Sequence, residues 1–132
     1  MEFTSFVLME IDPDDKKFIK EMGSYEIEEG NSYITRLYYD GKDVIIHFGI
    51  SKEVEDWEFS AIFDLFKKEA FQDKGFYIED MDEDYNPAWL ISFPYIEDRE
   101  SLEERLDEAG SLIEEKINEV LRDIEGKEED YQ

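Results

Sequence analysis

Cysteine is absent from this chain of 132 residues, and histidine occurs once, as His47. The lack of cysteine excludes disulfide bonds, thiolate metal sites and a thiol nucleophile. A lone histidine needs a nucleophile or a substrate within hydrogen-bond reach to act as a general base, and the sequence has no Gly-x-Ser-x-Gly motif to supply one. We therefore expect His47 to pack within a strand rather than to act in catalysis.

Basic residues and long apolar runs are also scarce. Lys and Arg total 14 against 38 Asp and Glu, which gives a formal net charge of -24. This charge predicts repulsion from nucleic acid and from anionic membranes, and the glycine motifs that bind phosphate are missing. No apolar run approaches the length of a membrane span, and the N-terminus lacks the basic start of a signal peptide. We expect a soluble cytoplasmic protein that binds neither nucleic acid directly nor membranes, and that carries no cofactor.

The chain does contain enough apolar and aromatic residues to form a hydrophobic core. Its hydrophobic fraction is 41% and its aromatic fraction 15%, which is too apolar for a disordered chain of high charge. The length fits one domain. We predict a single α+β domain over residues 1–126, followed by a frayed acidic tail over 127–132.

The apolar pattern predicts six strands, separated by turn residues. They are expected over 2–11, 17–28, 32–39, 44–50, 76–79 and 88–95. Gly30-Asn31 and Asp40-Gly41 are typical of hairpins, since these residues tolerate positive φ. The first four strands are therefore predicted to form an antiparallel meander, which the last two extend.

The period of the apolar residues changes after residue 52. Phe59, Phe63 and Phe66 fall on one face of a helix predicted over 53–68, which would continue through a break to residue 74. Residues 57–63 also alternate as a strand would, so a strand remains an alternative there. Gly75 is the residue expected after the end of a helix.

The last predicted helix covers residues 101–125 and completes the order ββββαββα. Ser101 and Glu104 form a capping-box pattern at its start. Its apolar residues recur at intervals of three and four, and they are Leu102, Leu106, Ala109, Ile113, Ile117, Val120 and Ile124. Gly110 costs this helix about 1 kcal/mol of propensity, which suggests that another backbone approaches it closely or that the helix bends there. We expect this helix and the central helix to cover one face of the sheet.

Two acidic clusters are weak candidates for cation sites. Asp80, Asp82 and Asp84 have the spacing of a calcium loop, but Tyr85 and Ile91 stand where such a loop needs Gly and Glu. The turn over residues 12–15 offers a second cluster of the same kind. A solvated turn is the favoured interpretation of both, and no specific metal site is predicted.

The clearest candidate surface is on the last helix. Acidic residues spaced by four or seven lie opposite its apolar stripe, namely Glu100, Glu104, Glu108, Glu115 and Glu119. They would form a docking strip for a basic partner, or simply a solvated face. Trp57 and Trp89 lie next to charged or turn residues, so we expect both to be partly exposed and to serve as interface anchors.

These observations favour a non-enzymatic interaction or regulatory module that binds a basic protein or peptide surface. One alternative is a nucleic-acid mimic that inhibits a DNA- or RNA-binding protein. Another is a small-ligand binder or enzyme with a pocket of carboxylates and aromatic side chains. If the last helix overhangs the sheet, its stripe would also support a homodimer.

Overall fold

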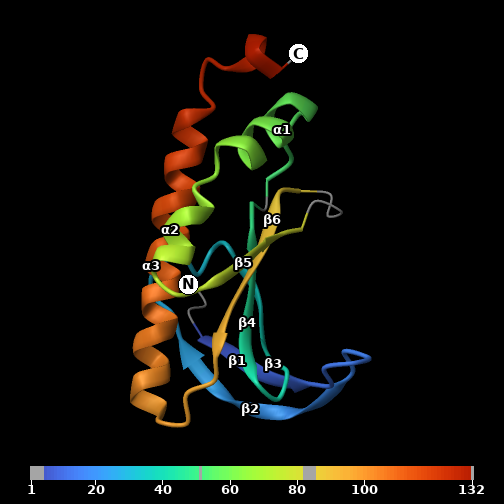
Figure 1. The fold of residues 1–132 in the computed structure, drawn as a ribbon, viewed down its shortest axis with the longest axis vertical. Helices are drawn as coiled ribbons and strands as arrows, with labels where there is room; N and C mark the ends of the chain where they lie inside the picture. Colours follow the sequence, from blue (N-terminus) through green and yellow to red (C-terminus); the bar gives the residue numbers. More distant parts are fainter. Residues whose placement is uncertain (1–4, 51, 82–85, 132) are drawn as a thin grey trace.

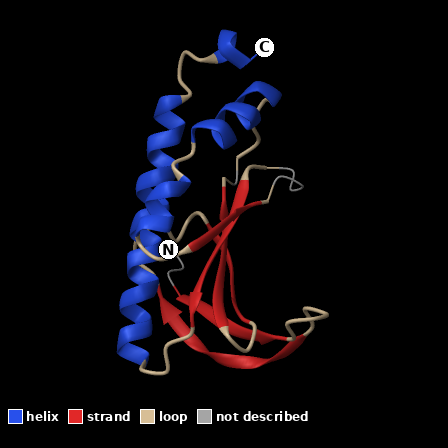
Figure 2. Ribbon diagram, in the orientation of Figure 1, coloured by secondary structure: helices blue, strands red, loops and turns tan. Residues whose placement is uncertain are grey.

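The fold is α+β, with a six-stranded mixed sheet, in a computed structural model that describes residues 5–50, 52–81 and 86–131. The strands are β1 (Ser5–Ile11), β2 (Phe18–Glu26), β3 (Ile34–Tyr39), β4 (Asp43–Gly49), β5 (Tyr77–Asp80) and β6 (Ala88–Pro94). The helices are α1 (Asp56–Leu65), α2 (Lys68–Asp73) and α3 (Arg99–Asp123), and a short 3-10 helix, η1 (Glu128–Tyr131), follows. Figures 1 and 2 show the helices gathered on one side of a strongly twisted sheet.

The strand order differs from the predicted meander. The sheet runs β2-β1-β3-β4-β6-β5, and β1 pairs parallel to β3, with Met9 opposite Tyr38. The expected antiparallel-only sheet is therefore wrong, although the α+β class is confirmed. The turn at Gly30 does occur, since the Tyr33 amide donates to the Gly30 carbonyl at 3.0 Å. However, the chain passes over the end of β1 there instead of closing a hairpin, because local turn residues do not specify which strand pairs next.

The central helical segment is confirmed, with the break inside it. Phe66 ends α1 in an extended conformation, and α2 begins at Lys68. The alternative of a strand over 57–63 is wrong. At the start of α1, Glu55 and Glu58 exchange side-chain and backbone hydrogen bonds in a capping box. The break turns the Phe66 ring into the core, where it is 5% exposed.

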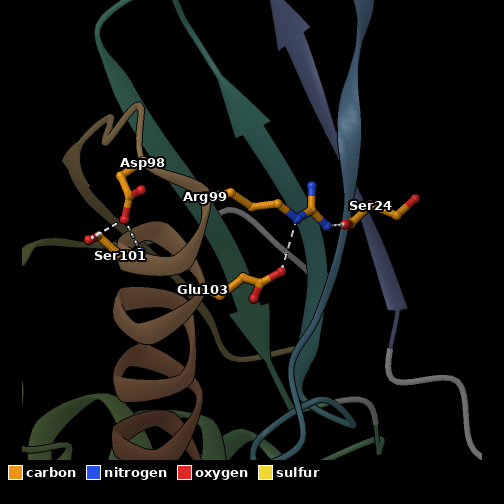
Figure 3. A network of polar contacts seen from close by, with 5 residues as sticks. All are labelled: Ser24, Asp98, Arg99, Ser101 and Glu103. Atoms are coloured by element: carbon orange, nitrogen blue, oxygen red, sulfur yellow. Dashed lines mark hydrogen bonds and ion pairs between the residues drawn. The ribbon is translucent and has the colours of Figure 1, made fainter.

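The long helix α3 begins two residues earlier than predicted. Its N-cap is Asp98, whose Oδ2 accepts hydrogen bonds from the Ser101 amide at 3.0 Å and from the Ser101 hydroxyl at 2.7 Å (Figure 3). The predicted cap at Ser101 is wrong because Asp98 stands one turn upstream and satisfies the same free amides. None of the helices in the described part of the chain has the length and apolarity needed to cross a membrane.

Gly110 lets α3 press directly on the loop after β2. A Cβ atom on Gly110 would lie 2.3 Å from the Glu29 carbonyl oxygen and 2.6 Å from Cγ2 of Ile27. The expectation that Gly110 permits close approach of another backbone is confirmed. This contact fixes the position of α3 relative to the β2–β3 connection.

The core lies between the sheet and the helices. Aromatic side chains fill its centre, where the Trp89 ring stacks on Phe66 at 4.1 Å between centroids and on Phe48 at 5.6 Å. The apolar residues of α3 are buried against them, including Leu106 and Ile113, which are both 0% exposed. The stripe that motivated a homodimer through α3 is therefore covered within the chain, and that homodimer stays a prediction.

Within the tail expected over residues 127–132, residues 128–131 form a 3-10 helix. Residues of η1 lie against α1, and the Tyr131 hydroxyl donates a hydrogen bond to Oδ2 of Asp64. Tyr131 is half-buried against the core. Residues 128–131 thus contact α1 at the upper end of the molecule in Figure 1.

Candidate functional site

The exposed side of α3 carries the row of carboxylates expected from the sequence. Glu100, Glu104, Glu108 and Glu115 are exposed, on the side of the helix away from its buried residues. Glu119 differs from the other four, because it is half-buried and pairs with two lysines. Its carboxylate lies 3.3 Å from the Lys67 ammonium and 3.0 Å from that of Lys116. Four of the five predicted residues therefore share one open surface.

Most of this row is not neutralised by neighbouring bases. Glu108 pairs with Arg105 at 2.9 Å. Within the described residues, no ion pair joins Glu100, Glu104 or Glu115 to a base. Like charges on successive helical turns repel one another and cost the helix a few tenths of a kcal/mol per pair. The surface is thus held together by the packing of α3, and its charges are available to an outside partner.

An acidic cleft of about 390 Å³ lies beside the N-terminal half of α3. Glu26 at the end of β2 and Glu28 just beyond it form one wall. Glu103 and Asp107 from α3 form the other, and Arg99 lies among them. The cleft therefore brings carboxylates from two distant parts of the sequence to one place.

Arg99 ties the helix to the edge strand. Its guanidinium donates to the Ser24 carbonyl oxygen and, through Nε, to Oε1 of Glu103 at 3.1 Å (Figure 3). It also lies over the Tyr25 ring, 4.4 Å from the centroid. These contacts use both its charge and its flat face, so Arg99 acts as a clamp between β2 and α3.

The cleft keeps an excess of negative charge in spite of Arg99. The pKa of Asp107, which lies at the rim, is raised above its ordinary value, chiefly by loss of solvation. The carboxylates of Glu28, Glu103 and Glu29 raise this pKa further, in that order. A raised carboxyl pKa shows that the surroundings disfavour a further negative charge. The neighbouring carboxylates, which make the smaller contributions to this shift, create a negative potential that attracts a cationic group from outside.

Of the two tryptophans, Trp57 is partly exposed as expected and Trp89 is not. Trp89 is 0% exposed in the middle of the core, so its expected exposure is wrong. Its strand carries alternating apolar residues that face α3, and this periodicity outweighs the nearby turn. Trp57 is half-buried at the C-terminal end of α3, where it borders a shallow pocket with Leu121 and Ile124. Its indole N–H donates to Glu55 at 2.7 Å.

The candidate cation cluster is only partly visible. Asp80 pairs with Lys68 at 3.2 Å, while Asp82 and Asp84 lie outside the described residues. Over residues 5–50, 52–81 and 86–131, no group of three or more His, Asp or Glu side chains is arranged to hold a metal ion. In the turn over residues 12–15, Asp12 accepts the amides of Asp14 and Asp15 at 2.8 and 3.1 Å. That carboxylate shapes the turn, as expected of an Asp in this position.

His47 lies on the sheet face that points away from α3. Its ring meets the Tyr38 ring edge-on, with centroids 5.4 Å apart. Thr35 on the neighbouring strand donates to the His47 carbonyl at 3.2 Å. Its place within β4 is therefore as expected, on a strand and packed against a cross-strand aromatic.

Sequence reasoning missed the cleft side of the acidic surface. Glu103 and Asp107 stand on the flank of α3 next to the predicted row, and Glu26 and Glu28 reach them from β2. The run Glu26–Glu29 is visible in the sequence as three acids in four residues. Its proximity to α3 depends on the Gly30 and Gly110 contact, which no local pattern specifies.

Comparison with known proteins adds a family but no activity. A family model described as "Family of unknown function (DUF6762)" matches residues 1–132. No curated protein and no solved structure matches the chain.

Proposed function

The chain belongs to the DUF6762 family of unknown function, and we propose that it is an interaction module which binds a basic protein or peptide surface. The contact would be made by the acidic surface, defined as Glu100, Glu104, Glu108 and Glu115 of α3 together with the cleft formed by Glu26, Glu28, Glu103 and Asp107. A partner would place lysine or arginine side chains along the helix, with one in the cleft.

The convergence of carboxylates from β2 and α3 on one cleft is the observation that carries this proposal. A surface that only keeps a protein soluble would spread its acids apart, because repulsion between them costs stability. Here the fold instead brings Glu28 and Glu29 from one segment against Glu103 and Asp107 from another. A basic side chain in the cleft would relieve the repulsion, so binding would gain from the strain in the free protein.

The test is binding of a cationic probe by variants of equal charge. The first variant neutralises the helix row (Glu100→Gln, Glu104→Gln, Glu108→Gln, Glu115→Gln). The control neutralises four exposed acids elsewhere (Asp14→Asn, Glu21→Gln, Glu69→Gln, Asp73→Asn). Both variants lose four negative charges from the same -24, so their net charges are equal.

We expect the helix-row variant to bind a deca-lysine peptide at least about tenfold more weakly than the control, as measured by titration calorimetry. Raising the salt concentration should weaken binding by the wild type, because exposed charge contacts are screened. Equal loss of affinity in both variants would mean that only net charge matters. That result would contradict a defined docking surface.

A further inference from the structure

The sheet has a second surface, which the acidic surface does not use. An apolar groove of about 340 Å³ crosses the face that points away from α3. Its lining includes Tyr38, Ile45 and Leu90 from three neighbouring strands, with Ile11 and Lys16 at one side. At the far edge of the same face, the Tyr77 side chain on β5 is 58% exposed. None of the helices in the described residues covers this face, which we call the open face.

The strand register orders the open face into two rows. Residues directly opposite on neighbouring strands share a face of a sheet. The first row crosses β3, β4, β6 and β5 through Tyr38, Ile45, Ser92 and Tyr77. The second row crosses the same strands through Arg36, His47, Leu90 and Glu79. The second row therefore begins with a cation, ends with a carboxylate and is apolar or aromatic between them.

We propose that the open face binds a second copy of this chain, with the two sheets packed face to face. A two-fold axis parallel to the strands would pass between β4 and β6. This axis places β3 of one copy over β5 of the other, so each row lies on the reversed row of its partner. Arg36 then faces Glu79 of the second copy, and Tyr38 faces Tyr77 of the second copy.

The pattern is self-complementary, which a symmetric dimer requires. In such an interface the same patch occurs on both copies, so a contact between two different residues forms twice. The Arg36–Glu79 pair would form at both ends of the contact. His47 would lie over Leu90 of the second copy near the axis. The exposed Tyr77 ring would enter the mouth of the groove, where it would stack over the Tyr38 ring.

The charge distribution permits this contact in spite of the net charge of each copy. Two chains of -24 repel each other, so an apolar patch alone would be a weak reason to associate. The row of Glu100, Glu104, Glu108 and Glu115, however, lies on α3, which is on the other side of the sheet (Figure 1). Face-to-face packing puts both acidic helices on the outside of a four-layer dimer. Both sheets would then separate these helices by more than the screening length of about 10 Å.

The size of the contact sets the expected affinity. Four strands spaced by about 4.8 Å make a face some 20 Å wide. Because these strands are 4 to 7 residues long, or about 13–23 Å, the face covers less than the roughly 800 Å² per partner that stable interfaces bury. We therefore expect a concentration-dependent dimer, with a dissociation constant in about the micromolar range.

Sedimentation equilibrium of the full chain, over about 1 µM to 1 mM, tests this proposal. The wild type should approach twice the 15.8 kDa mass of one chain as its concentration rises. Arg36→Glu and Glu79→Arg should each raise the dissociation constant at least about tenfold, because both symmetric pairs become repulsive. The double variant with both changes restores opposite charges and should return to within about threefold of the wild type. Glu69→Arg on α2, outside both surfaces, changes the net charge as Glu79→Arg does and is the control that should leave dimerisation intact.

Two results would overturn the proposal. One is a wild type that stays monomeric over the whole concentration range. The other is a dimer that ignores the single charge reversals or is not restored by the double swap, since the contact would then lie elsewhere. Arg36 and Glu79 are exposed, so the variants should fold, and their thermal melting curves should confirm this before sedimentation. Glu79 accepts a hydrogen bond from Tyr77, and Tyr77→Phe reports the effect of losing that bond alone.

Discussion

Gly30 and Gly110 meet backbone to backbone where the β2–β3 connection crosses α3. A Cβ atom on Gly30 would lie 2.2 Å from the Gly110 carbonyl oxygen. Real Cβ atoms do not approach backbone oxygens so closely, and backbone on both sides leaves little room to shift. The fold therefore depends on having no side chain at either position.

Gly110→Ala tests this contact, because two effects oppose each other. Alanine favours the helix by about 1 kcal/mol, whereas its methyl group would overlap the Glu29 carbonyl at 2.3 Å. We expect the overlap to dominate and the free energy of unfolding to fall by about 1–3 kcal/mol in urea denaturation. Ser111→Ala, on the exposed side of the same turn, should change stability by less than about 0.5 kcal/mol. A stabilised Gly110→Ala variant would show that the two segments can separate at little cost.

Trp89 should tolerate phenylalanine better than alanine. The ring is buried among aromatic side chains, and its Nε1 has no hydrogen-bond partner within the part of the chain that the structure describes. Trp89→Ala would leave a large cavity and cost about 3–5 kcal/mol. Trp89→Phe keeps ring stacking and removes this buried donor, so we expect a cost below about 2 kcal/mol.

Tryptophan fluorescence checks the environment of Trp89 separately. In a Trp57→Phe variant, emission comes from Trp89 alone and should lie at the short wavelengths of an apolar site. Unfolding should shift this emission to longer wavelengths. Emission typical of water in the folded protein would contradict a wholly buried Trp89.

Ionisation of Asp107 should lower the free energy of unfolding, and this effect should depend on pH. Its pKa is raised in the folded protein above the ordinary value of 3.8, by lost solvation first and by neighbouring carboxylates second. Between these two pKa values the folded state binds more protons than the unfolded state, so this group makes stability fall as the pH rises. Asp107→Asn should therefore stabilise the protein at pH 7. The gain should vanish below the ordinary pKa, where the wild-type carboxyl is protonated in both states.

Urea denaturation of the wild type and Asp107→Asn across pH 3–7 measures this effect. Glu104→Gln, on the open side of α3, is the matched neutralisation outside the cleft. A gain for Asp107→Asn that is constant with pH would mean that the amide adds a contact of its own. In that case repulsion by the carboxylates of the cleft would not be the cause of the gain in stability.

Tyr131→Phe should release the end of the chain and leave the rest intact. The hydroxyl of Tyr131 holds η1 to Asp64 of α1. Without it, amide hydrogen exchange should quicken over residues 128–131 and remain unchanged in β4 and β6. Faster exchange throughout the sheet would show instead that the tail supports the whole domain.

The sequence predicted local structure well, since period and turn residues act over a few positions. Strands β4 and β6 and helix α3 follow directly from the spacing of Ile46, Ile91 and Ile113, which are all buried. The same reasoning failed for pairing partners. Nothing within β1 indicates that β3 lies parallel to it, because that arrangement depends on a connection that passes over the sheet.

The candidate site could likewise be predicted where it depends on local structure and not where it depends on tertiary contacts. The row from Glu100 to Glu115 was predictable because one helix carries it. The cleft was not, because Glu28 meets Asp107 only after the Gly30 loop has docked on α3. The burial of Trp89 was predicted wrongly for a related reason. The alternation of apolar residues along its own strand is a better guide to burial than the turn nearby.

The order of elements along the chain has a consequence for synthesis. All six strands leave the ribosome before α3, which covers their apolar face and buries Leu106 and Ile113 against it. A nascent chain that has been synthesised only as far as residue 98 would thus expose the apolar face of its sheet to solvent and be prone to aggregation. Synthesis of α3 then covers this apolar face. The same helix carries the strongest concentration of negative charge, so the step that buries the core also adds the repulsion that opposes aggregation.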